Sequence, residues 1–406
     1  MRHLRAVTLC IVVLWVGCAE EFSGRPPLLG EFHYPIGIAV DQTENKLLVF
    51  NSNFDLAYES ASLVTVNLDD HSFSDAWLAM GSFPGDIVFV EGDDGSARGY
   101  FTVRGNDSIT WFSAGQSDGS YTLFCNDSND PSLHKCTGTH VVSEGVIPDE
   151  EEVDGELEVD LGSEPTALAL IPGTGDVPDR LVSGALSDGS VTLLDFDESG
   201  APVVVDQYSA IQGINHVAVE PSHGHIYVSN RFFSLLYRLQ VEEGSEGPKL
   251  DLMSTVSLPG PLSTANYGRG LAFAGEGRYL LLAYRTPAAV LVLDTVDDAE
   301  AFSQNTLALI SVGGGPSRIR VLPTGPGGKE LAYVTCFDDD KVWVLDLADL
   351  VVVDQIDVGA GPYDLAARLS DTEPRAYVSN FLDDTISVID LDPTSPYYHT
   401  QIAEIH

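Results

Sequence analysis

Four polar side chains occupy the same position of a repeated turn, and they are of the types that acid–base chemistry or ligand binding uses. They are Asp86, His216, Arg318 and Asp364. Each is the third residue of a short apolar segment, as in PGDIVFV or PYDLAA, where other copies have a small residue such as Gly37 or Ala167. A histidine and two carboxylates can transfer protons or hold a metal, and an arginine can bind an anion. We therefore predict a ligand-binding rim at these positions, provided that the copies lie close enough for their side chains to converge.

Arginines at a second repeated position offer a different chemistry. Arg231 and Arg285 directly follow an apolar, strand-like run in two copies of the repeat, and Arg104 lies beside them at the end of a third run. We expect these arginines to pair with local carboxylates, and the alternative is that they bind an anionic ligand.

Calcium is the metal that best fits the acidic turns. Asn51, Asn53 and Asp55 alternate, and further acids cluster at 338–340 and 383–384. Oxygen ligands on short loops suit Ca²⁺, although the glycine and the final glutamate of a calcium-binding loop are missing. No haem-attachment, zinc, P-loop, dinucleotide or serine-hydrolase motif is present, so no other cofactor is predicted.

The charge balance limits the possible partners. The 406 residues include 61 Asp plus Glu against 20 Lys plus Arg, a formal net charge of −41. A chain without a basic face is a poor match for nucleic acid or for an anionic membrane surface.

Internal repeats determine the fold class. Seven copies of a hairpin pattern occur, clearest in AYVSNFLDDTISVIDL from Ala376, and each follows a Gly/Pro-rich turn and a small-and-aliphatic strand. One further strand separates each hairpin from the next turn, so the unit is four antiparallel strands. This predicts an all-β, seven-bladed β-propeller over residues 34–406, in which the last blade packs on the first.

The segments "YVSN…TISVIDL" and "VGAGP" resemble the YVTN propeller repeat of bacterial and archaeal surface proteins. The resemblance covers essentially the whole of 34–406 and is strongest in the last two copies. It implies the propeller fold and a surface or periplasmic location, and it says almost nothing about chemistry.

The N-terminus predicts export. Residues 1–17 combine a short positive segment with an apolar run, and Gly17-Cys18 resembles a bacterial lipobox, in which the cysteine is lipidated. Trp15 departs from that pattern, and the alternatives are ordinary secretion or a retained anchor. The residue after Cys18 is Ala19, which by the same resemblance points to the outer membrane. Residues 18–33 would then be a tether.

One interval between repeats is about 80 residues instead of about 50, which places an insertion at about 114–155 in the second blade. It contains an acid-rich stretch and the pair Cys125 and Cys136, for which export predicts a disulfide. The insertion is interpreted as a solvated loop, or alternatively as a docking arm. Cys336 is expected to be a buried small side chain.

The function predicted from these features is a non-enzymatic binding scaffold at the bacterial outer membrane. Its partner would be an envelope protein or a glycan, it would touch the membrane only through its lipid, and it would be monomeric. The alternative is a lactonase-like or metal-assisted propeller hydrolase, and a quinoprotein-like redox subunit is disfavoured because no ligands for its cofactor are recognisable.

Overall fold

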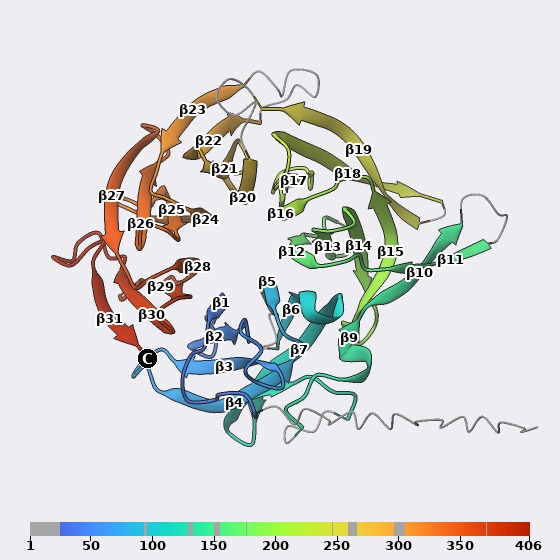
Figure 1. Ribbon diagram of the computed structural model, residues 1–406, viewed down its shortest axis with the longest axis horizontal. Helices are drawn as coiled ribbons and strands as arrows, with labels where there is room; N and C mark the ends of the chain where they lie inside the picture. The colour runs from blue at the N-terminus through green and yellow to red at the C-terminus, as the bar shows by residue number, and fades with distance from the viewer. Residues whose placement is uncertain are drawn as a thin grey trace, which may run out of the picture.

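The computed structural model describes residues 25–92, 96–128, 133–149, 155–175, 177–245, 247–258, 266–295, 305–370 and 372–406. In these residues the chain forms seven four-stranded antiparallel blades around a central channel, so the predicted seven-bladed propeller is confirmed (Figure 1). No helix in this part of the chain is long and apolar enough to span a membrane. The predicted signal segment and Cys18 lie outside the described residues.

Each blade is built from contiguous sequence, with its first strand beside the channel and its last strand at the rim. Blade 1 consists of β1 (Pro35–Asp41), β2 (Lys46–Asn51), β3 (Ala61–Asn67) and β4 (Phe73–Met80). Blade 2 consists of β5 (Pro84–Glu91), β6 (Ala97–Val103), β7 (Ser108–Ser117) and β8 (Ser120–Phe124). Blade 3 consists of β12 (Pro165–Ile171), β13 (Arg180–Ala185), β14 (Ser190–Phe196) and β15 (Pro202–Ser209). Blade 4 consists of β16 (Ile214–Val219), β17 (Ile226–Asn230), β18 (Leu235–Gly244) and β19 (Gly247–Ser257).

The remaining three blades repeat the same order. Blade 5 consists of β20 (Asn266–Ala274), β21 (Tyr279–Thr286), β22 (Ala288–Asp294) and β23 (Thr306–Ser311). Blade 6 consists of β24 (Pro316–Gly325), β25 (Lys329–Cys336), β26 (Lys341–Asp346) and β27 (Val351–Asp357). Blade 7 consists of β28 (Pro362–Arg368), β29 (Arg375–Asn380), β30 (Thr385–Asp390) and β31 (Gln401–Ile405).

The hydrophobic core lies between the blades, because both faces of each blade are covered. In β25, Leu331 and Tyr333 pack towards blade 7, whereas Ala332 and Val334 pack towards blade 5. Successive residues of a strand point to opposite faces, so a continuous apolar run is what a strand between two neighbours requires.

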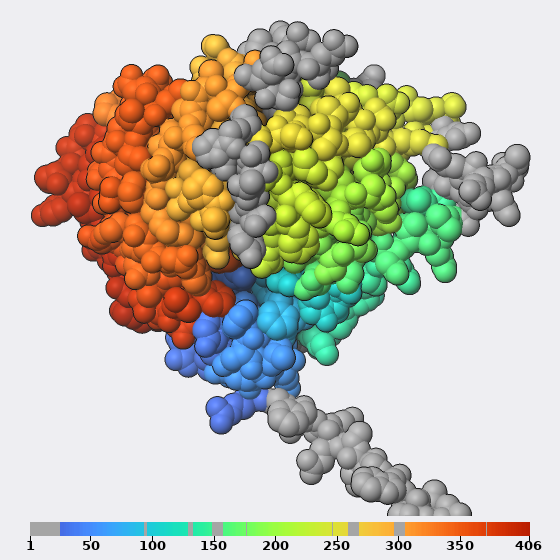
Figure 2. Space-filling view, turned by 45° about the horizontal axis from the view of Figure 1, so that its top comes forward, coloured from blue at the N-terminus to red at the C-terminus, as the bar shows by residue number. Residues whose placement is uncertain are grey.

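The ring closes by packing blade 7 against blade 1, as the sequence predicts. Leu47 and Val49 of blade 1 share a buried cluster with Tyr377 and Ile386 of blade 7. The backbone N–H of Tyr34 also donates to the Asp384 carboxylate at 2.6 Å. In the space-filling view the blades follow one another in chain order, and the blue first blade lies beside the red last blade (Figure 2).

The blade 2 insertion interrupts the rim strand of that blade. β8 covers one end of β7 and the short β9 (Val141–Val142) covers the other, with the 3₁₀ turn η2 (Gly138–His140) before β9. The predicted disulfide between Cys125 and Cys136 is present in this loop. A two-stranded hairpin follows, β10 (Glu144–Asp149) and β11 (Gly155–Asp160), and projects beside β15 (Figure 1). The acids at 150–154 lie outside the described residues.

Candidate functional site

Every blade begins with the same backbone irregularity at the channel mouth. The pairing of the first strand with the second shifts register near the start of each first strand, for example between Pro84 and Ile87 and between Pro316 and Ile319. A β-bulge inserts an extra residue and redirects the neighbouring side chains. The second and third residues of a first strand can therefore both face the channel, which strict alternation would forbid.

Three of the four predicted rim residues meet across the channel. Arg318 of blade 6 donates a hydrogen bond to the carboxylate of Asp86 in blade 2, and Nε2 of His216 lies 3.6 Å from that carboxylate. Asp364 instead accepts from the Arg320 guanidinium at 2.9 Å. The innermost strands are thus close enough for side chains of non-adjacent blades to pair.

Burial governs the protonation of this group. Burial lowers the pKa of His216 well below its ordinary value, and the positive charges of Arg318 and Arg320 lower it further. Burial also raises the pKa of Asp86, although Arg318 and Arg320 oppose that effect. Asp86 and His216 are 8% and 7% exposed, so these two side chains are buried rather than an accessible acid–base pair.

A cavity of about 400 Å³ lies at the channel mouth and has Arg318 in its lining. Every blade contributes one residue from the same repeat position, which directly follows the second strand in six blades and lies near the end of β21 in blade 5. These residues are Ser52, Arg104, Leu186, Arg231, Arg285, Phe337 and Phe381. The residue just before the predicted rim position of several first strands completes the wall, including Asn215, Arg269 and Tyr363. We call this cavity the arginine cup.

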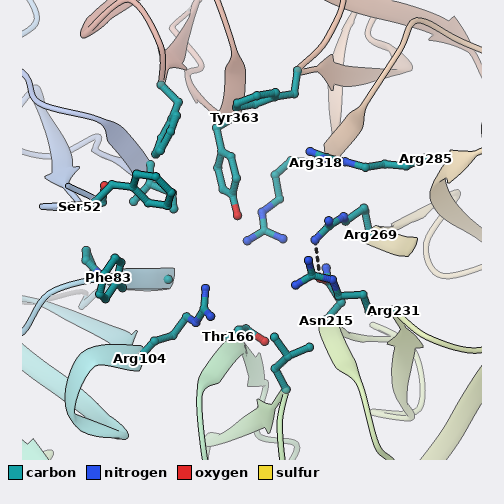
Figure 3. Close-up of a pocket in the computed structure, with 17 residues that line it drawn as sticks. Ser52, Phe83, Arg104, Thr166, Asn215, Arg231, Arg269, Arg285, Arg318 and Tyr363 are labelled. Atoms are coloured by element: carbon teal, nitrogen blue, oxygen red, sulfur yellow. Dashed lines mark hydrogen bonds between the residues drawn. The ribbon is translucent and has the colours of Figure 1, made fainter. Parts of the chain in front are cut away.

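Five arginines line the cup, and Figure 3 shows their guanidinium groups directed into it. They are Arg104, Arg231, Arg269, Arg285 and Arg318. Arg104 pairs with Glu164 as expected, and Arg318 pairs with Asp86. In the part of the chain that the structure describes, the other three have no carboxylate within ion-pair distance, contrary to the expected local pairing of Arg231 and Arg285.

The three arginines without a carboxylate have at most neutral partners. Arg269 donates to Oδ1 of Asn215 at 2.8 Å, and Arg285 donates to Oγ of Ser317 at 3.0 Å. Burial and the charges of Arg285, Arg231 and Arg318 lower the pKa of Arg269 to about 10. Guanidinium groups in this arrangement repel one another, so the cup is an electrostatically unfavourable site that an anion would relieve.

Aromatic side chains form another part of the wall. The ring centroids of Phe54 and Phe381 are 5.3 Å apart, and those of Phe337 and Phe381 are 5.9 Å apart. The Arg318 guanidinium lies 5.5 Å from the Tyr363 ring, and that of Arg285 lies 5.6 Å from the Phe337 ring. The cup thus combines positive charge with an aromatic surface.

Sequence reasoning missed part of this wall. It selected the repeat position of Asp86 and Arg318 and so did not include Arg269 and Tyr363, which directly precede that position in their own strands and lie in the wall beside the bulge. It also placed Arg104 at the end of a strand, whereas β6 ends at Val103 and Arg104 begins the 3₁₀ turn η1 (Arg104–Asn106). Arg104 is therefore equivalent to Arg231 and Arg285, and that shared position was the available signal.

The acidic turns considered for calcium are engaged in hydrogen bonds with the protein. Oδ1 of Asn53 accepts from the backbone of Tyr58 at 3.0 Å, and Asp55 contacts His33 at 3.0 Å. Asp340 accepts from the backbone N–H of Gly361 at 3.0 Å. These acids tie turns and neighbouring blades together, and calcium binding there stays a prediction.

Within the described residues, one group of three metal-ligating types gathers elsewhere, at Glu220, His223 and His225. The Glu220 carboxylate accepts the backbone N–H groups of Ser222 and His223 at 2.8 and 2.7 Å. The Arg238 guanidinium lies 2.9 Å from Nδ1 of His225, which places a positive charge against any cation. We interpret this group as a hydrogen-bonded turn.

No protein-family model matches the chain, and no curated protein sequence matches it. Solved structures do match its fold. A functionally unknown protein from Desulfotomaculum acetoxidans is 12% identical, with a TM-score of 0.56, over 91% of this chain and 94% of that one. A candidate 6-phosphogluconolactonase from Bacteroides fragilis is 16% identical, with a TM-score of 0.53, over 81% and 85%. Chaetomium thermophilum Sqt1 is 11% identical, with a TM-score of 0.57, over 94% and 88%. These similarities show the propeller fold alone.

Proposed function

We propose that this protein is a binding propeller of the bacterial cell envelope that captures a small organic anion in the arginine cup. One observation carries the proposal. In a chain of net charge −41, five arginines line one cavity, and three of them have no carboxylate partner among the described residues. Such an arrangement destabilises the free protein, so a ligand that compensates it is the simplest reason for its presence.

The wall of the cup supports binding rather than hydrolysis. The described residues that line it offer guanidinium, hydroxyl, amide and apolar groups, and no carboxylate, histidine or cysteine is among them. A lactonase-like activity, suggested by the architecture, would need a base or a metal ligand beside the substrate. His216 and Asp86 would be the nearest candidates, and both are buried outside the lining.

Direct titration tests the proposal. Inorganic phosphate, sulfate and citrate would be titrated into the full-length protein by calorimetry, at low and at physiological salt. We expect saturable binding that weakens as salt rises, because exposed charges are screened. Arg231→Gln combined with Arg285→Gln should weaken binding by roughly tenfold to a hundredfold per arginine.

Arg278→Gln is the matched control, since Arg278 is exposed, pairs with Asp294 and lies outside the cup. Its affinity for the same anions should equal that of the wild type. Absence of saturable binding for every anion, or an equal loss in the control, would contradict the proposal.

The location is part of the proposal and rests on the sequence. The lipobox-like Gly17-Cys18 and the resemblance to the YVTN repeat support an outer-membrane lipoprotein. Cys18→Ser should abolish lipid labelling and release the protein from the membrane fraction with an unchanged circular dichroism spectrum. A variant that stays with the membranes and keeps its first residues would show that the segment is an anchor.

A further inference from the structure

The inference concerns the class of anion and rests on the proposed function. The two parts of the cup differ sharply in chemistry. In Figure 3, Arg231 and Arg269 lie on one side of the cavity and Arg318 reaches its middle, whereas Phe83 lies on the opposite side, where Arg104 is the only labelled arginine. Phe54 and Phe83 are in edge-to-face contact, with ring centroids 6.2 Å apart. A ligand that fills this cavity must offer charge on one side and an apolar surface on the other.

The charge that the ligand must carry follows from the pairing of the arginines. Glu164 offsets Arg104 and Asp86 offsets Arg318, which leaves Arg231, Arg269 and Arg285. The Nε atom of each of these three is buried and has no hydrogen-bond partner in the described part of the chain. A single carboxylate would leave most of the positive charge of these three arginines without a counter-charge. A group with two negative charges and several acceptor oxygens matches adjacent guanidinium groups better.

The surface around the mouth is apolar as well. Phe54 and Leu56 of the turn between β2 and β3, and Leu382 of the turn between β29 and β30, are 56%, 60% and 54% exposed. Phe232 and Phe233 follow Arg231 on the turn between β17 and β18 and are about half exposed. These turns share the face that carries the cup, because they all join a second strand to a third.

We propose that the cup binds an amphipathic dianion, a doubly charged group such as a phosphomonoester attached to an aromatic or other apolar body. The dianion contacts Arg231, Arg269 and Arg285. The body packs against the aromatic wall that includes Phe54 and Phe381. The ligand can be a soluble aromatic compound or the headgroup region of an anionic lipid, because both present this chemistry.

The experiment compares probes that share one charged group. Inorganic phosphate, methyl phosphate, phenyl phosphate and benzoate would be titrated into the full-length protein and into Arg269→Gln and Phe54→Ser. We expect phenyl phosphate to bind at least tenfold more tightly than methyl phosphate and than benzoate. Phe54→Ser should remove most of the advantage of phenyl over methyl and leave inorganic phosphate unchanged. Arg269→Gln should weaken all three phosphates.

Phe233→Ser is the matched control for Phe54→Ser, because Phe233 is similarly exposed on the same face but does not line the cup. Vesicles of phosphatidylcholine with and without phosphatidic acid separate the two sources of ligand. If Phe233→Ser weakens binding to vesicles with phosphatidic acid but leaves binding of phenyl phosphate unchanged, the ligand is the lipid. Binding of phenyl phosphate without vesicle binding would identify a soluble compound.

Two results would overturn the inference in distinguishable ways. If methyl and phenyl phosphate bind equally well, the cup takes dianions without an apolar body, and the proposed function stands while this inference fails. If no phosphate probe binds, this inference fails, and the proposed function fails with it only if sulfate and citrate do not bind either. Thermal unfolding of each variant verifies that a loss of binding does not reflect loss of the fold.

Discussion

Replacing Arg269 with methionine should make the free protein more stable, although it removes a hydrogen bond. Burial and three neighbouring guanidinium groups lower the pKa of Arg269 from 12.5 to about 10. Since each pKa unit corresponds to about 1.4 kcal/mol, holding this charge in the empty cup costs at most roughly 3 kcal/mol. Loss of the 2.8 Å hydrogen bond to Asn215 lowers the stability of the variant by about 1 kcal/mol. Water in the cup screens part of the repulsion, so we expect a net gain of about 1 to 2 kcal/mol.

Urea unfolding of the full-length chain at low ionic strength, in a buffer without multivalent anions, measures this gain. Adding sulfate or sodium chloride should stabilise the wild type more than Arg269→Met and shrink the difference. Arg278→Met is the control and should change stability by less than about 0.5 kcal/mol. If Arg269→Met is less stable than the wild type in the anion-poor buffer, the arginines of the cup do not repel one another as argued.

Four further predictions concern buried groups. Asp86→Asn should lower the free energy of unfolding by about 3 kcal/mol in urea titrations, because it leaves a buried guanidinium unpaired; a change below about 1 kcal/mol would contradict the cross-channel ion pair. Folded His216 stays neutral, so as pH falls below about 6.5 only the unfolded chain gains its proton and stability falls. As the pH falls through this range, the free energy of unfolding of His216→Gln should therefore decrease by up to about 1.4 kcal/mol less per pH unit than that of the wild type. Parallel pH profiles of the two proteins would refute the neutral state of folded His216. Replacing Cys125 and Cys136 with serine should cost at most about 3 kcal/mol, with faster hydrogen exchange confined to the insertion. Thiol labelling of the native protein should spare Cys336, which is buried and whose pKa is raised to about 12.

The sequence specifies the architecture because each blade repeats one local pattern. Apolar runs such as LAYV in β25 need a neighbour on both faces, and seven of them with turns between can satisfy that need only by stacking around an axis. The same reasoning places Asp86, His216 and Arg318 at equivalent positions. It could not show that they meet, because the width of the channel depends on the packing of all seven blades.

The composition of the cup was harder to predict, for a local and a long-range reason. The bulge at the start of each first strand brings a second residue into the wall, so Arg269 and Tyr363 escape an argument based on strict alternation. Whether Arg231 and Arg285 find carboxylates depends on acids from other blades. In an acid-rich chain local pairing is the natural expectation, but among the described residues no carboxylate lies within ion-pair distance of either side chain.

The hydrogen bond between Asp86 and Arg318 also constrains how the number of repeats in the chain could have changed. Blades 2 and 6 sit on opposite sides of the ring, so one side-chain pair spans the channel only while the circumference stays at seven blades. Duplicating one more repeat between them would widen the ring and separate the two side chains. An added repeat would therefore cost the protein this buried ion pair.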